Sequence, residues 1–128
     1  MRVAGRDLPL AALQWLGLLA APAAVLSQQI FGVALTLAQC NAAGRSWQLP
    51  VHALSAAATA VAAVVAALGV IAAVLALQAT AGVEDQAAPP PGRVHFLAVV
   101  GLTVSPLLLA VILMDGFGVG FHEACRQS

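Results

Sequence analysis

The sequence is poor in charge and has no lysine. Its five arginines and five acidic residues make up 8% of 128 residues, whereas charged residues make up ~25% of a typical soluble domain. A small water-soluble domain exposes a large share of its surface, and that surface needs polar groups. The shortage of charge therefore argues against an ordinary soluble domain and against a soluble enzyme. The lack of a basic excess also excludes a nucleic-acid-binding protein, because nothing neutralises the phosphates.

What the sequence has instead is long apolar runs, and 62% of its residues are hydrophobic. A helix that crosses the ~30 Å hydrocarbon core of a bilayer needs ~20 apolar residues. Three segments meet this requirement, at about residues 10–37, 54–79 and 94–114. The sequence therefore predicts an all-α integral membrane protein with three transmembrane helices, built as a single transmembrane domain over residues 1–128.

Two more polar segments follow the second and third spans. Residues 80–93 contain two acidic residues and three consecutive prolines, and we expect them to form a polar, Pro-rich inner loop. Residues 115–128 are expected to form an outer tail. The first span also has features of a signal peptide, because Arg2 and Arg6 precede it. Its apolar run is longer than that of a usual signal peptide, so we interpret it as a retained membrane anchor.

The arginines predict an orientation, because cytoplasmic loops of membrane proteins are enriched in basic residues. With three spans, three arginines fall on one side of the membrane and two on the other. Those on the first side are Arg2, Arg6 and Arg93. The majority predicts that the N-terminus lies inside and the C-terminus outside, in the inner (cytoplasmic) membrane of a bacterium.

The two cysteines fall on the same side of the membrane, opposite the N-terminus. Cys40 follows the first span by three residues, and Cys125 lies near the end of the chain. A side that faces away from the cytoplasm permits disulfides. We therefore predict a Cys40–Cys125 bridge that ties the end of the first helix to the tail after the third. Two free thiols, or a metal or redox role, are the alternatives.

Two histidines fall near the same membrane boundary as the cysteines. Thiolates and imidazoles are good ligands for copper and zinc. The alternative metal site would use Cys40, His52, His122 and Cys125. Their spacing matches no compact metal motif, and histidines at headgroup level are poorly placed to hold a haem between helices. We therefore expect ordinary hydrogen bonds at these histidines, with no metal and no cofactor.

Polar and small residues form a stripe along one side of the first helix. At 100° per residue, its members lie within roughly 40° of one direction. They are Gln14, Ala21, Gln28, Gly32, Thr36 and Gln39. Because an amide that faces lipid is costly, the stripe should face protein. It packs either against the second helix of this chain or against a larger partner subunit, and we predict partner packing at the polar residues and Gly32.

The second and third helices carry fewer polar signals. Small residues recur at Ser55, Thr59, Ala63 and Ala67, which is typical of a close helix crossing. In the third span, Pro106 frees the Leu102 carbonyl, which the Ser105 hydroxyl is expected to satisfy. Asp115 is expected at the outer boundary, solvated or paired with an arginine. No charge lies within residues 54–79, which argues against an ion path.

Several segments together resemble a known group of proteins. They are residues 16–22, the pair Gln28–Gln29, Cys40, residues 90–98, residues 105–114 and residues 125–128. The chain resembles the small, uncharacterised three-helix membrane proteins that accompany bacterial haem–copper terminal oxidases of the cytochrome c oxidase type. The resemblance covers nearly the whole chain, and it implies a role beside an oxidase. The family supplies no active-site motif to carry over.

The expected function is that of an accessory or assembly subunit of a bacterial respiratory membrane complex, a terminal oxidase. Such a chain acts by helix packing, has larger membrane subunits and lipid as partners, and is not itself an enzyme. One alternative is a copper- or haem-handling membrane protein that uses the outer cysteines and histidines. A second alternative is a self-associating small transporter or pore. Metal analysis would identify the first alternative, and copurification separates the subunit from the pore.

Overall fold

The computed structural model describes residues 2–3, 6–7, 9–40, 50–82, 91–121 and 125, and these form three long helices. The helices are α1 (Leu10–Gln39), α2 (Val51–Ala79) and α3 (Pro91–Phe121). Each begins at or next to a proline, because the fixed φ of proline suits the first helical position and its missing N–H costs nothing there. The all-α, three-helix prediction is confirmed.

The helices are long and apolar enough to span a bilayer. They contain 30, 29 and 31 residues, or about 43–46 Å at 1.5 Å per residue, against a hydrocarbon core of ~30 Å. Large apolar side chains point outward, among them Ile30 and Leu107, which are 70% and 69% exposed. Such a surface is stable in lipid and not in water. The chain is a multi-pass membrane protein.

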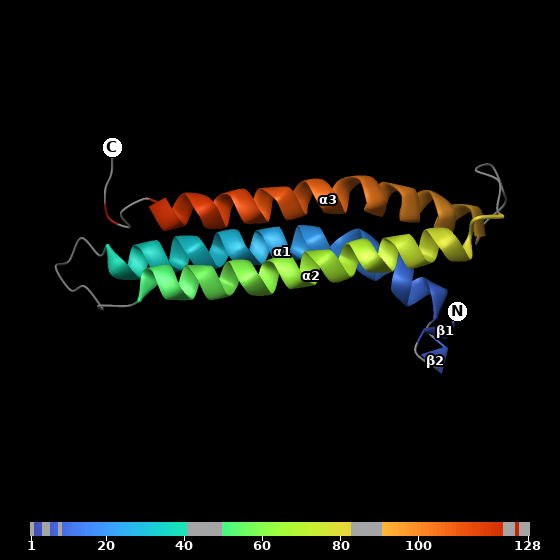
Figure 1. Cartoon of the computed structure of the whole chain (residues 1–128), viewed down its shortest axis with the longest axis horizontal. Helices are drawn as coiled ribbons and strands as arrows, with labels where there is room; N and C mark the ends of the chain where they lie inside the picture. The colour runs from blue at the N-terminus through green and yellow to red at the C-terminus, as the bar shows by residue number, and fades with distance from the viewer. Residues whose placement is uncertain are drawn as a thin grey trace.

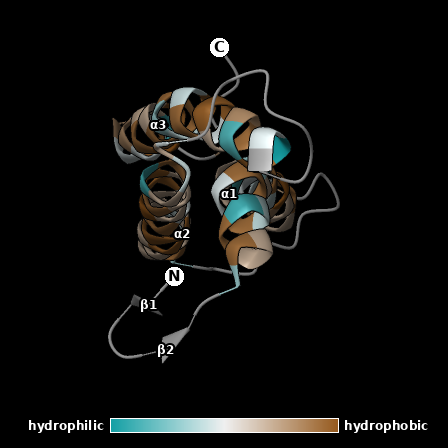
Figure 2. Cartoon of the chain, turned by 90° about the vertical axis from the view of Figure 1, so that its right-hand side faces the viewer, coloured by the Kyte–Doolittle hydropathy of each residue, from teal (hydrophilic) through white to brown (hydrophobic). Residues whose placement is uncertain are grey.

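The three helices run up, down and up, side by side (Figure 1). Seen end-on, they occupy the corners of a triangle (Figure 2). The end of α1, the start of α2 and the C-terminus share one end of the bundle, which holds Cys40 and Cys125 and is called the cysteine end below (Figure 1). The N-terminus lies at the opposite, N-terminal end. There the short antiparallel strands β1 (Arg2–Val3) and β2 (Arg6–Asp7) pair, which the sequence did not predict.

Helix α3 is longer than the span predicted for it. It begins at Pro91 and continues to Phe121, so the predicted loop over residues 80–93 and tail over residues 115–128 are both shorter than expected. The start of the tail continues α3 as far as Phe121, although glycines recur in it. The rest of both segments, residues 83–90, 122–124 and 126–128, lies outside the described residues.

The core is built from small side chains that let the backbones approach closely. Ala21, Ala66 and Ala76 are fully buried. A Cβ added at Gly17 would lie 2.8 Å from the backbone nitrogen of Ala73, and one added at Gly101 would lie 2.7 Å from the carbonyl oxygen of Gly17. All three helices therefore meet at backbone distance near Gly17. This is the packing that membrane helices use in place of large apolar side chains.

Candidate functional site

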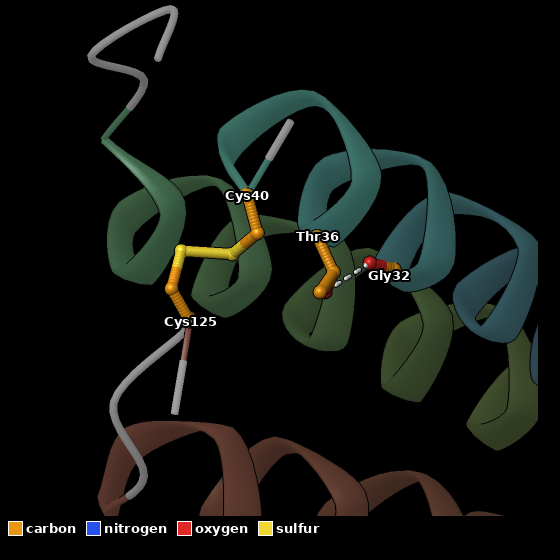
Figure 3. Close-up of a disulfide and its surroundings, with 4 residues drawn as sticks. All are labelled: Gly32, Thr36, Cys40 and Cys125. Atoms are coloured by element: carbon orange, nitrogen blue, oxygen red, sulfur yellow. Dashed lines mark hydrogen bonds between the residues drawn. A yellow bond between two sulfur atoms is a disulfide. The ribbon is translucent and has the colours of Figure 1, made fainter. Parts of the chain in front are cut away.

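A disulfide joins Cys40 to Cys125 at the cysteine end (Figure 3). Cys40 is the residue at which α1 ends, and its N–H donates to the Thr36 carbonyl. The two Cα atoms are 5.4 Å apart and the sulfurs 2.01 Å apart. The bridge predicted from the sequence is therefore present, and it holds the end of α1 to the segment that follows α3.

The disulfide removes both thiolates from the alternative metal site. His52 lies exposed in the first turn of α2, and His122 lies outside the described residues. Over the described part of the chain, no cluster of three or more Cys, His, Asp or Glu side chains is positioned to hold a metal ion. The oxidised chain thus offers His52 as a hydrogen-bonding group at this end of the bundle.

The polar stripe on α1 divides into a buried part and an open part. Gln14 and Gln28 are only 2% and 6% exposed, so the chain's own helices cover them. Gly32 has nothing within 4 Å of an added Cβ, and Thr36 is exposed. The Thr36 hydroxyl donates to the Gly32 carbonyl at 2.9 Å (Figure 3). Gln39 is half-buried. Internal packing thus accounts for the buried amides, whereas partner contact at Gly32 and Thr36 stays a prediction.

Gln28 connects all three helices through one amide. Its Nε2 group, on α1, donates to Thr59 Oγ1 of α2 at 3.1 Å and to the Ile112 carbonyl of α3 at 3.3 Å. Its Oε1 atom is buried and has no hydrogen-bond partner among the described residues. Such an orphaned acceptor is unusual in a folded protein and costs free energy in an apolar medium.

Two further polar contacts cross between helices. Ser105 Oγ, fully buried, donates to the Gly17 carbonyl of α1 at 3.1 Å. The expectation that this hydroxyl satisfies Leu102 was therefore wrong, because the close approach of α1 places a better acceptor beside it. At the N-terminal end, Thr80 Oγ1 and His95 Nδ1 are 3.0 Å apart. These contacts hold helices in register and lie away from the cysteine end.

A cavity of about 370 Å³ lies toward the cysteine end of the bundle. All three contribute lining residues, and the polar ones are Gln28, Gln29, Thr36, His52, Ser55 and Asp115. This space is called the cysteine-end cavity below. It combines one carboxylate, one imidazole, two amides and two hydroxyls within an otherwise apolar bundle. The sequence had placed His52 and Asp115 near one membrane boundary and Gln28 and Thr36 on the stripe of the first helix, but it had given no reason to place them around one space.

Asp115 is the acidic residue of this cavity. It is half-buried and lies six residues before the end of α3, which is about 9 Å along the helix axis. If α3 is centred in the bilayer, its ends extend ~8 Å beyond the hydrocarbon core on each side. Asp115 then lies at the boundary between acyl chains and headgroups, as the sequence predicted. The arginines proposed to pair with it, Arg45 and Arg126, lie outside the described residues.

A second hollow lies along the outer surface of the bundle between α1 and α2, with a volume of about 540 Å³. Most of its lining side chains are small, namely Ala23, Ala24, Ser27, Ala57, Ala58 and Ala62. Phe31 and Val65 also line it. This α1–α2 groove is a place where another apolar helix can approach the backbones of α1 and α2.

The two spaces differ in what they can do chemically. The cysteine-end cavity can donate and accept hydrogen bonds and can pair with a positive charge. The α1–α2 groove is mainly apolar, with Ser27 and Gln28 as its polar lining residues. Comparison with protein-family models, with curated proteins and with solved structures gave no match for this chain.

Proposed function

We propose that this chain is an accessory or assembly subunit of a bacterial respiratory membrane complex, a terminal oxidase, and that it acts by helix packing without catalysing a reaction. It lies in the bacterial inner membrane with its N-terminus inside and its C-terminus outside. The observation that carries this proposal is the α1–α2 groove, a hollow of small side chains on a surface that faces lipid.

Small residues on a lipid-facing surface support a helix partner. Lipid chains are as apolar as leucine, so helices associate in membranes through close packing and interhelical hydrogen bonds. Other parts of the outer surface carry large residues such as Ile30, Leu107 and Met114. Along the groove, by contrast, Ala57 and Ala58 leave room for a second backbone. A transmembrane helix of a larger subunit is the occupant that gains most from that room.

The kind of complex is supported by the resemblance described for the sequence. The segments over residues 16–22 and 105–114 resemble small proteins that accompany haem–copper oxidases. They lie on α1 and α3, and the first of them ends at Pro22, next to the groove residue Ala23. The disulfide is consistent with an outer end that faces an oxidising compartment.

Copurification tests this proposal. An affinity-tagged chain is expressed at native level, solubilised in mild detergent, and analysed for oxidase subunits and for haem absorbance. Ala57→Leu fills the groove and is expected to lower recovery of the oxidase about tenfold or more, because the loss of close packing removes most of the contact. Ala53→Leu makes the same change on the same helix, at an exposed position outside the groove, and should leave recovery unchanged.

Two outcomes would contradict the proposal. One is recovery of the wild-type chain without any respiratory subunit. The other is equal recovery of the oxidase with Ala57→Leu and Ala53→Leu, which would place the contact on another face. Gly32→Leu then tests the open part of the α1 stripe, because no atom of the described residues lies within 4 Å of a Cβ added there.

A further inference from the structure

We propose that the cysteine-end cavity binds the headgroup of a phospholipid that carries both a phosphate and a primary ammonium group. The ammonium pairs with Asp115 of α3, and the phosphate lies at the first turn of α2. This site goes beyond the proposed subunit role, and it belongs to the chain alone.

The depth of the cavity suits a headgroup. Four of its polar lining residues lie within about two turns of the helix ends: Thr36 is four residues from Cys40, and His52 is the second residue of α2. With helices about 43–46 Å long in a core of ~30 Å, these four positions lie where acyl chains meet headgroups, and Gln28 lies deeper, about three turns from the end of α1. A lipid whose headgroup enters the cavity therefore keeps its acyl chains in the surrounding bilayer.

One side of the cavity is suited to a cation with N–H donors. Asp115 brings a carboxylate, and none of the lining residues in the described part of the chain is an arginine. Gln28, 6% exposed, lines the same cavity, and its Oε1 atom has no partner in the described chain. A primary ammonium carries three N–H groups and can serve both acceptors. Because Oε1 is itself covered, the Gln28 amide must turn toward the cavity for that second contact to form.

The other side of the cavity is suited to an anion. Val51 and His52, the first two residues of α2, both line it. Among the described residues no side chain caps this helix, and the earliest intrahelical donor is the N–H of Leu54, which bonds to the Pro50 carbonyl at 2.9 Å. The N–H groups before Leu54 therefore have no acceptor within the helix. Free N–H groups and the helix dipole attract phosphate, and the His52 imidazole adds a donor beside them.

The pairing of the two sides defines which lipids fit. Phosphatidylethanolamine has a phosphate and a primary ammonium, so it satisfies both sides. Phosphatidylcholine has the same net charge, but its quaternary ammonium has no N–H group to donate. Phosphatidylglycerol has the phosphate without a cation, and Asp115 opposes its negative charge. The cavity should therefore select by hydrogen-bond donors as well as by charge.

Native mass spectrometry of the purified, oxidised chain tests this selection. The chain is equilibrated with equal amounts of these three lipids, with matched acyl chains, and the retained lipid is identified by mass. We expect phosphatidylethanolamine to be retained about tenfold over phosphatidylcholine, the ratio expected from one charge-assisted hydrogen bond. Equal retention of all three lipids by the wild-type chain would overturn the proposal, and this comparison depends on no variant.

Variants then locate the site. Asp115→Asn keeps the shape of the side chain and removes its charge. The retention of phosphatidylethanolamine relative to phosphatidylcholine should therefore fall to about one. Thr103→Val is the matched control, because Thr103 lies exposed on the same helix outside the cavity and bonds only its own helix. An unchanged preference in Asp115→Asn, or an equal loss in Thr103→Val, would contradict the assigned site.

A soluble competitor separates a lipid from a free headgroup. Phosphoethanolamine has the same polar groups without acyl chains, and at equal concentration it should leave the bound lipid in place. Displacement by it would show that the cavity takes a small soluble molecule and would overturn the lipid assignment. All these measurements use the chain without a partner, so failure of the proposed subunit role would leave their outcome unaffected.

Discussion

Gly17 is the residue at which the three helices come closest. Its carbonyl accepts the Ser105 hydroxyl of α3, and its Cα faces the backbone of Ala73 on α2. A methyl group at position 17 would meet backbone atoms at 2.8 and 2.9 Å, and backbone atoms cannot move aside as the end of a side chain can. The identity of this residue therefore determines how closely the helices pack.

Gly17→Ala is accordingly expected to lower the free energy of unfolding by about 1–3 kcal/mol, the usual cost of overpacking. Gly32→Ala is the matched control, because the same added methyl meets nothing within 4 Å there. It should leave stability unchanged or slightly raised, since alanine is the better helix former. Equilibrium unfolding in mixed micelles measures both variants. Equal stability of the two would contradict the close crossing at Gly17.

Gln28 provides a second test at the residue scale. Gln28→Met keeps the length of the side chain and removes both interhelical hydrogen bonds together with the orphaned acceptor. Because these effects oppose one another, we expect a loss of only about 0.5–1 kcal/mol. Gln29→Met changes the neighbouring, exposed amide and should cost nothing in micelles. A loss above ~3 kcal/mol in Gln28→Met would show that the amide bridge is stronger than interhelical bonds in membranes usually are.

At the scale of helices, the disulfide and the closest contact of all three helices lie at different ends of the bundle. Gly17 and Gly101 pack in the half nearer the N-terminus, whereas Cys40 and Cys125 join α1 to the segment after α3 at the far end. Nearer that far end α2 and α3 still approach closely, because a Cβ added at Gly116 would lie 3.1 Å from the Cβ of Thr59. The disulfide therefore adds a covalent link from α1 at the end where the cysteine-end cavity lies.

Reduction should loosen this end alone. A closed loop of 85 residues would contribute ~4–5 kcal/mol by chain entropy, but inserted helices are already confined, so we expect a smaller loss. Hydrogen exchange should rise in the last turns of α1 and stay unchanged around Gly17. The double variant Cys40→Ser/Cys125→Ser should behave as the reduced chain does and should not respond to reductant. Increased hydrogen exchange along the whole of α1 would contradict the prediction that reduction loosens only the cysteine end.

The helices were predictable from the sequence because length and apolarity alone decide whether a segment can cross a bilayer. The disulfide was predictable because three crossings bring Cys40 and Cys125 to one side. The extension of α3 was not, since glycines at 116, 118 and 120 read as interruptions, whereas the helix continues through them to Phe121. The partner of Ser105 was also missed, because sequence spacing identifies acceptors within a helix and says nothing about a neighbouring one.

The cysteine-end cavity is the part of the candidate site that could not be predicted from the sequence. In the sequence, His52 and Asp115 stood out as polar residues near one boundary, and Gln28 stood out as part of the stripe on the first helix. Which of them share a space depends on how each helix is rotated about its axis. That rotation follows from the packing of Gly17, Ala73 and Gly101, at the other half of the bundle. Local sequence patterns therefore identified the polar residues of the cavity but not how these residues are arranged in space.

The whole molecule places its two termini at opposite ends of the bundle (Figure 1). We predict that the cysteine end faces away from the cytoplasm. Alkaline phosphatase, which is active only outside, should therefore be active when fused to the C-terminus. It should be inactive when fused after Gly82, which follows α2 at the N-terminal end. The reverse pattern would invert the orientation, and with it the side on which the headgroup site lies.

The position of the disulfide in the chain has a consequence for biogenesis. Two whole helices, α2 and α3, separate Cys40 from Cys125, so the bond can form only after the last helix has been laid beside the first. The presence of the Cys40–Cys125 disulfide therefore shows that all three helices of that molecule have been inserted. A chain stalled before α3 keeps Cys40 as a free thiol, and a thiol-reactive label applied to living cells would count immature molecules directly.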